Sequence, residues 1–177
     1  MQTLKEKYNK TVVPEMKKKF GYKSNFAVPK ILKVVISTGT GSLKDENKKK
    51  IIEKSLALIT GQKPVENPAK KSIASFKLRQ GMTIGYSVTV RRKRMYSFLE
   101  KLINAAIPRI RDFRGLDSSS IDETGNLTIG FKEHIVFPEV SDQDVRESFG
   151  LGVTVATNAK TKPEAVELLK FIGFPIK

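Results

Sequence analysis

The feature that most constrains the fold lies at residues 83–106, where one hydrophobic period gives way to another. Between Thr83 and Arg91, apolar residues alternate with small or polar ones, which predicts a half-buried strand. From Arg94 to Ala106, apolar residues instead recur every three or four positions, which predicts an amphipathic helix. Its apolar stripe consists of Met95, Phe98, Leu99, Leu102, Ile103 and Ala106. We expect this stripe to lie in the core.

The predicted strand has two unlike faces. One face carries Ile84, Tyr86, Val88 and Val90, and the other carries Thr83, Gly85, Ser87, Thr89 and Arg91. The second face would make a poor core. It suits RNA, because small side chains let a sugar–phosphate backbone approach and hydroxyl groups can bond phosphate or ribose.

Other elements follow from the same kind of pattern. A helix is expected over residues 2–19, with Leu4, Tyr8, Val12 and Met16 on one stripe, and Pro14 should kink it or divide it into two short pieces. Two further helices are expected, one over about 43–60 with Ile52, Leu56 and Ile59 inward and one after a capping box formed by Thr161 and Glu164. Strands are expected over 30–37, where Leu32, Val34 and Ile36 alternate with polar residues, and over 63–66, 127–131 and 151–157. Helices and strands do not alternate regularly. The order predicts a single α+β domain over residues 1–177, with a mostly antiparallel sheet, helices packed on one face and a long basic loop over residues 69–82.

The positive charge is concentrated in one part of the chain. The 177 residues carry a net charge of +15, with 24 basic and 7 acidic side chains in residues 1–107 but 9 basic and 11 acidic in residues 108–177. No acid occurs from Asn67 to Leu99, a window that holds Lys70, Lys71, Lys77, Arg79, Arg91, Arg92, Lys93 and Arg94. Interleaved aromatic residues favour a nucleic-acid site over a merely solvated basic face. The near-neutral half of the chain suggests a protein partner.

Composition excludes several kinds of chemistry. The chain has no cysteine and one histidine, His134, so disulfides, thiolate catalysis and Cys- or His-based metal clusters are excluded. We expect His134, which lies near Glu133 and Glu139, to be a surface or capped residue. We predict no catalytic residue, no bound metal and no cofactor. No apolar run approaches the ~20 residues of a membrane span, so we expect a cytoplasmic protein without membrane contact.

Two short segments leave alternatives open. Residues 38–42 place two glycines between a strand and a helix but lack the Gly-Lys-Ser/Thr of a nucleotide loop. They form either a tight turn or a place where backbone amides approach an RNA phosphate. Arg109, Arg111 and Arg114 either contact phosphate or pair with Asp112 and nearby acids.

Several segments are similar to the 5S-rRNA-binding protein family of the bacterial large ribosomal subunit, ribosomal protein L-five. The similarity covers nearly the whole chain in the right order. The segments are 61–64 (GQKP), 69–74 (AKKSIA), 76–82 (FKLRQGM) with 84–85 (IG), 88–91 (VTVR), 95–99 (MYSFL), 108–115 (PRIRDFRG) and 137–139 (FPE).

The resemblance implies a structural role and three sets of contact residues. The family attaches 5S rRNA to the large subunit and forms part of the central protuberance, beside large-subunit rRNA and neighbouring ribosomal proteins. The positions that match its 5S-rRNA surface are Lys33, Ser37, Thr38, Gly39, Gly41, Lys63, Thr89 and Arg91, with Arg92 as an added phosphate contact. Those of the loop that reaches P-site tRNA are Lys70, Lys71, Ser72, Phe76, Lys77 and Arg79. Those expected to meet a small-subunit protein at an intersubunit bridge are Arg109, Arg111, Arg114, Asp142, Asp144 and Phe149.

This sequence departs from the family at two of those positions. Ser37 stands where asparagine is usual, and Arg92 stands where glycine is usual. The serine has a shorter reach and one donor fewer than an amide, whereas the arginine adds charge. The alternatives to a ribosomal component are a free RNA-binding factor or chaperone and, more remotely, an RNA-modifying enzyme.

Overall fold

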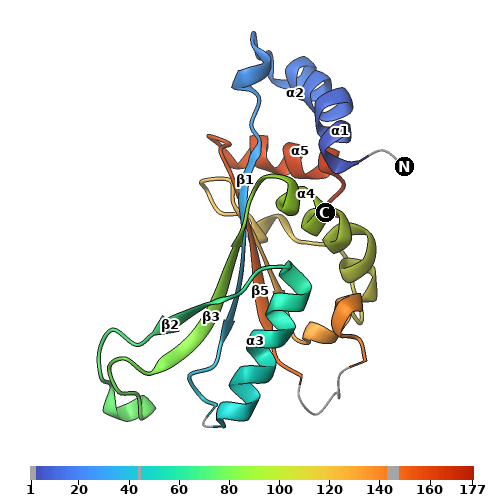
Figure 1. Cartoon of the computed structure of the whole chain (residues 1–177). Helices are drawn as coiled ribbons and strands as arrows, with labels where there is room; N and C mark the ends of the chain where they lie inside the picture. The colour runs from blue at the N-terminus through green and yellow to red at the C-terminus, as the bar shows by residue number, and fades with distance from the viewer. Residues whose placement is uncertain (1–2, 44, 143–147) are drawn as a thin grey trace. The chain divides into compact units, whose positions relative to one another are not determined.

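The computed structural model describes residues 3–43, 45–142 and 148–177 and confirms the α+β class (Figure 1). Its five strands form one antiparallel sheet in the order β2-β3-β1-β5-β4. The strands are β1 (Ile31–Gly39), β2 (Val65–Pro68), β3 (Thr83–Val90), β4 (Leu127–Phe131) and β5 (Leu151–Thr157). The α-helices are α1 (Leu4–Lys7), α2 (Val13–Phe20), α3 (Glu46–Thr60), α4 (Arg92–Lys101) and α5 (Lys162–Ile172).

The chain divides into two compact units. Unit 1 comprises Met1–Val34, Val90–Ile129 and Thr154–Lys177, and unit 2 comprises Val35–Thr89 and Gly130–Val153. Each unit is therefore assembled from separate stretches of sequence, and the boundaries fall inside β1, β3, β4 and β5. The predicted division of charge at residue 107 does not coincide with these boundaries.

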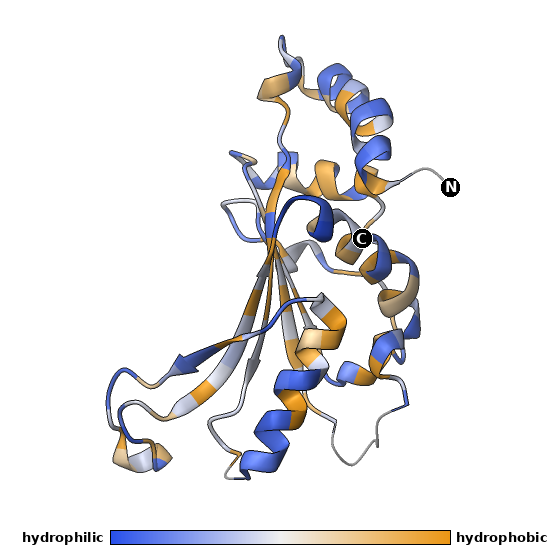
Figure 2. Ribbon diagram, viewed as in Figure 1, coloured by the Kyte–Doolittle hydropathy of each residue, from blue (hydrophilic) through white to orange (hydrophobic). Residues whose placement is uncertain are grey.

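Unit 2 is built on the alternation that the sequence predicts for β3. Tyr86 and Val88 are buried, whereas Ser87 and Thr89 are partly exposed. The edge strand β2 pairs antiparallel with β3, and Val65 lies opposite Ser87. Helix α3 carries a hydrophobic stripe alongside a hydrophilic one (Figure 2). Its residues Ile52, Leu56 and Ile59 are buried, as predicted, and Gly61 ends the helix at a φ of 67° by donating its N–H to the Ala57 carbonyl.

Unit 1 begins with a helical stretch that passes through Pro14 without a break. A π-helical turn, Tyr8–Val12, joins α1 to α2 directly before the proline. Proline lacks an N–H and crowds the carbonyl four residues earlier, and a π turn relieves that clash. In place of a sharp kink, the helix accommodates Pro14 through this π-helical turn, where it is locally wider than an α-helix. Val12 and Met16 are fully buried, as the predicted stripe requires.

The second long helix of unit 1 is α4, which continues through a π-helical turn, Leu102–Ala106. Five of the six residues of the predicted core stripe are buried, and the sixth, Ile103, is partly exposed, so the prediction is confirmed except at Ile103. A single 3₁₀ turn with Pro108 at its centre then ends the helical run.

Three local predictions are wrong. Thr161 makes no capping hydrogen bond with its side chain, and Glu164 accepts from the N–H of Lys160 instead, so the capping box does not form. Ile31 takes the first core position of β1 and leaves Leu32 exposed, because the alternation of this strand starts only at Val34. His134 is not at the surface: it is completely buried in unit 2.

Candidate nucleic-acid interface

In unit 2, one side of the strands carries several small residues, beside Val65 and Asn67 of β2, which lie opposite Ser87 and Gly85. Ser37 and Gly39 of β1 are exposed, and Ser37 Oγ lies 3.7 Å from the place that a Cβ atom would take on Gly152 of β5. A Cβ atom on Gly39 or Gly130 would meet no atom within 4 Å. The protein itself therefore does not fill the space above these two glycines. Such a surface admits a ligand backbone to close range.

Position 85 requires glycine for a different reason. A Cβ atom at this position would lie 2.7 Å from the carbonyl oxygen of Thr38, closer than real Cβ atoms come to any neighbour. The backbones of β1 and β3 approach each other here, and only glycine fits. The alternation of β3 places Gly85 on the side predicted to face RNA. Its packing requirement comes from the protein's own backbone.

The residues at the end of β1 differ in how they could meet a ligand. The Thr38 side chain is buried, and its hydroxyl donates to the Gly150 carbonyl at 2.7 Å. Gly41 is partly exposed, in a turn where Thr40 N–H donates to the Ile84 carbonyl at 2.8 Å. These contacts describe a tight turn, which was one of the two alternatives left open. RNA contact by Thr38 would have to use its backbone, and it stays a prediction.

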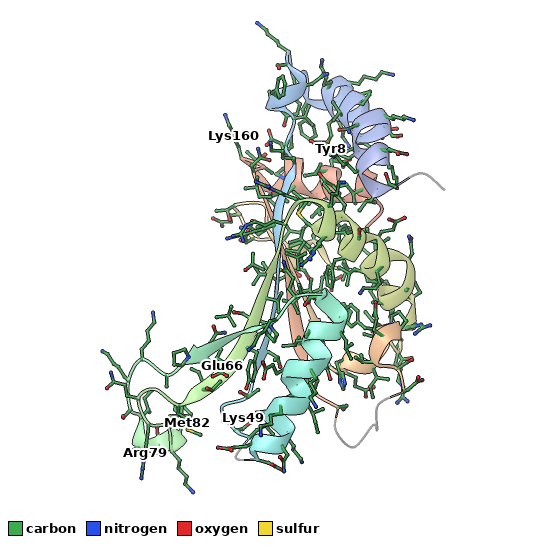
Figure 3. All side chains as sticks on the ribbon, viewed as in Figure 1. Tyr8, Lys49, Glu66, Arg79, Met82 and Lys160 are labelled. Atoms are coloured by element: carbon green, nitrogen blue, oxygen red, sulfur yellow. The ribbon has the colours of Figure 1, made fainter. Side chains whose placement is uncertain are left out.

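The loop of residues 69–82 has more internal structure than its sequence suggests. Ile73 and Leu78 exchange two backbone hydrogen bonds of 3.0 and 3.1 Å, and the Ala69 N–H donates to the Met82 carbonyl at 2.9 Å. A 3₁₀ turn, Ala74–Phe76, forms the tip. Figure 3 shows Arg79 extending from this loop into open space. All six residues predicted to contact tRNA are exposed, namely Lys70, Lys71, Ser72, Phe76, Lys77 and Arg79.

The remaining cations of the predicted 5S-rRNA surface are also exposed. Lys63 belongs to unit 2, and its ammonium group is 3.9 Å from Glu53, with 86% of the lysine side chain exposed. A pair so open contributes little to stability and leaves the lysine accessible. Lys33, Arg91 and Arg92 belong to unit 1 and are exposed.

Arg92 adopts a backbone conformation that suits glycine. Its φ is 57°, in the left-handed region, and it begins α4. A residue with a side chain pays about 1–2 kcal/mol for this conformation. The strain falls at one of the two positions where this sequence departs from the family pattern. Compared with glycine at this position, Arg92 has a more strained backbone, and its side chain adds a positive charge.

We therefore expect Arg92→Gly to raise the free energy of unfolding by about 0.5–1 kcal/mol, less than the full strain because glycine also loosens the unfolded chain. Urea denaturation measures this change. The matched control is Arg91→Gly, where φ is −136° and no strain is relieved. If Arg92→Gly destabilises the protein as much as the control does, the left-handed backbone of Arg92 stores no strain that glycine can relieve.

The residues predicted to meet a protein partner fall into three groups. Arg109, Arg111 and Arg114 are exposed, and among the described residues no acid lies within 4.0 Å of their guanidinium groups. Pairing with Asp112 is thus not seen, which leaves these arginines available. Asp142 is exposed, whereas Asp144 lies outside the described residues.

Phe149 has a contact that sequence reasoning missed. Its ring stacks on the buried His134 ring, with centroids 4.0 Å apart and planes inclined by 16°. The N–H of Phe149 also donates to His134 Nδ1 at 3.3 Å. Phe149 is only 9% exposed, so its predicted contact with a partner is untested, and its ring serves the packing of unit 2.

The charged and aromatic residues of the described structure give no sign of a metal centre. Over residues 3–43, 45–142 and 148–177, no three histidine, aspartate or glutamate side chains gather as metal ligands would. Within the same ranges, no helix has the length and apolar character needed to cross a membrane.

Burial raises the pKa of Tyr86, helped by the negative charges of Glu66 and Glu53, so its hydroxyl stays neutral. The fold and these surfaces define a basic RNA-binding protein of the α+β class.

Comparison with known proteins identifies the family. Residues 24–79 match the model described as "Ribosomal protein L5", and residues 83–176 match the model of the C-terminus of the same family. The chain is 49% identical over 176 residues to the large ribosomal subunit protein uL5 of Halothermothrix orenii, covering 99% of this chain and 98% of the relative. It is 50% identical over 177 residues to that of Thermus thermophilus, covering 98% and 96%. The chain belongs to the ribosomal protein L5 family.

Proposed function

We propose that this chain is a structural component of the large ribosomal subunit that binds rRNA and, more specifically, holds 5S rRNA at the central protuberance. Its place is then the cytoplasmic ribosome. The family supports the first part of the proposal. One observation carries the second: β1 exposes Ser37 and Gly39, and β3 partly exposes the hydroxyl residues Ser87 and Thr89, while apolar residues that alternate with them, such as Ile36 and Val88, are buried.

This surface suits an RNA helix. The base edges of such a helix are hidden in a narrow groove, so a protein reads it mainly through phosphates and 2′-hydroxyl groups. Ser37 and Thr89 offer hydroxyls at the surface, and Gly39 offers backbone without a side chain in the way. Lys63 supplies charge within unit 2, and Arg91 of unit 1, two residues after Thr89 in the sequence, is proposed to contact the same RNA.

The two other proposed contacts use other parts of the chain. The loop of residues 69–82, with its exposed cations and the 70% exposed Phe76, would reach P-site tRNA. Arg109, Arg111 and Arg114, together with Asp142, Asp144 and Phe149, would meet a small-subunit protein across an intersubunit bridge. Arg109, Arg111 and Arg114 are exposed and have no ion pair with an acid of the described residues, which supports that second contact because arginine is enriched at protein interfaces.

The test is a binding titration with transcribed 5S rRNA at several salt concentrations. We expect log affinity to fall by about 0.7–0.9 for each unit of log salt and each phosphate contact. Arg91→Ala should weaken binding about tenfold, in line with the loss of one charged hydrogen bond, and should reduce the salt slope by about one contact. A double Lys77→Ala, Arg79→Ala variant should retain 5S-rRNA affinity, because its loop is assigned to tRNA.

The matched control is Lys170→Ala, which removes one exposed charge from α5, outside every proposed contact. Affinity that is insensitive to salt, or equal losses for Arg91→Ala and the control, would refute the proposed 5S-rRNA surface. The alternative of a free RNA-binding factor predicts that the protein leaves large subunits in a high-salt wash. Sedimentation of washed subunits separates the two functions.

A further inference from the structure

The side chain of Phe26 is an exposed aromatic group that the proposed 5S-rRNA surface does not use. It lies in a 3₁₀ turn, Asn25–Ala27, between α2 and β1 in unit 1, and it is 97% exposed. Figure 2 shows apolar colour in this turn, among hydrophilic residues. An isolated surface residue of this kind is common. Its surroundings are what make Phe26 informative.

The turn that presents Phe26 is held at both ends. On its first side, Ser24 Oγ accepts from the Phe26 N–H at 3.2 Å, and Lys17 Nζ donates to Asn25 Oδ1 at 2.9 Å. On its second side, the hydroxyl of Tyr8 donates to the Pro29 carbonyl at 3.0 Å. Burial raises the pKa of Tyr8 to about 12, so this donor keeps its proton. The ring is thus displayed on a fixed backbone, which lowers the entropic cost of binding.

The sequence around the turn is rich in lysine and free of acid. From Met16 to Lys44 there is no aspartate or glutamate, and the same stretch holds seven lysines. Lys23 and Lys30 flank the turn and are exposed. Two acids of α5 do reach this part of unit 1, because Glu167 pairs with Lys19 at 2.7 Å and Glu164 interacts with the Tyr22 hydroxyl. The net local charge stays positive.

We propose that Phe26 is a stacking platform for an unpaired base of ribosomal RNA, with Lys23 and Lys30 beside the sugar–phosphate backbone. The inference rests on the proposed function and adds a second RNA contact to it. A protein partner would favour a contiguous apolar patch. Here the exposed residues next to Phe26 in the sequence are Ser24, Asn25 and the small Ala27, with Lys23 and Lys30 beyond them. The setting of the ring is thus mostly polar and cationic, which suits base stacking on single-stranded RNA.

The experiment compares full-length Phe26→Ala, Phe26→Leu and Phe26→Trp in binding to transcribed 5S rRNA and, separately, to purified large-subunit rRNA. We expect the alanine and leucine variants to lose about tenfold in affinity for at least one of these RNAs, because stacking is worth about 1–3 kcal/mol per base. The tryptophan variant should retain affinity within about twofold. Leu58→Ala, which truncates a 57% exposed apolar residue in unit 2, is the control and should bind normally.

The outcomes separate this inference from the proposed function. If Phe26→Leu binds both RNAs as well as the wild type, the contact is not stacking and the inference fails. If Phe26→Ala leaves both RNA affinities unchanged but reduces incorporation into subunits, the partner of this ring is a protein, and the inference fails. In either case the proposed 5S-rRNA surface is tested separately, by the salt dependence of binding and by Arg91→Ala, and the failure of the stacking inference leaves that proposal standing.

Discussion

Gly85→Ala is expected to lower the free energy of unfolding by about 2–3 kcal/mol, the cost of forcing extra volume into a packed site. The added Cβ atom would lie 2.7 Å from the carbonyl oxygen of Thr38. That oxygen belongs to the backbone of β1, so it cannot turn aside as a side chain could. Strands β1 and β3 must move apart. Thermal unfolding should show a midpoint lower by about 5–10 °C, and urea denaturation gives the free energy.

Gly39→Ala is the matched control for this prediction. It makes the same chemical change in unit 2, at a position where the new atom meets nothing within 4 Å and φ is not positive. Stability should change by no more than about 0.5 kcal/mol. Equal effects at the two glycines would show that the approach of Thr38 to Gly85 is not what requires glycine there.

Most elements could be predicted from the sequence because their periods are unambiguous. Strand β5 is expected over the residues it occupies, and the predicted inner faces of α3 and α4 are correct. These elements bury one face, and burial is what creates a hydrophobic period. The start of β1 is harder to predict, because Ile31 and Leu32 are equally apolar and only the structure shows which one is buried.

Sequence patterns are least informative where a residue's role depends on a partner distant in sequence. Nothing local to Thr38 reveals that its hydroxyl bonds to Gly150, 112 residues away. The backbone bonds inside the 69–82 loop are hidden for a related reason, since Ile73 and Leu78 pair without any alternation around them. The left-handed φ of Arg92 has a visible signal, because the family usually has glycine there.

The exposure of charged contact residues is easier to predict from the sequence than the burial of a polar core residue such as His134. Charge predicts exposure, and Lys33, Lys63 and Arg91 are all exposed, whereas small size does not, because Ser37 is exposed but Thr38 is buried. The exposure of a residue does not identify the RNA that the residue binds. This is why the assignment of 5S rRNA and tRNA to separate surfaces rests on binding measurements.

His134→Ala is expected to lower the free energy of unfolding by about 3–4 kcal/mol, although the sequence predicts a surface or capped residue here. Two losses add together. The stacked contact with Phe149, at 4.0 Å between ring centroids, disappears and leaves a cavity. The buried N–H of Phe149 also loses its acceptor, His134 Nδ1. Urea denaturation of the variant and the wild type measures the sum.

Two further variants separate these losses. His134→Phe keeps a stacked ring without the acceptor, and His134→Asn keeps a polar group without the full ring, so each should fall between the alanine variant and the wild type. A change under about 1 kcal/mol for His134→Ala would refute the packing role. Below its unfolding temperature, His134→Ala should still bind 5S rRNA with normal affinity, because a completely buried imidazole offers RNA no contact. Unchanged affinity together with lost stability would assign His134 to folding. Lost affinity in the folded variant would instead show that the His134–Phe149 pair also shapes the surface of unit 2 that is proposed to bind 5S rRNA.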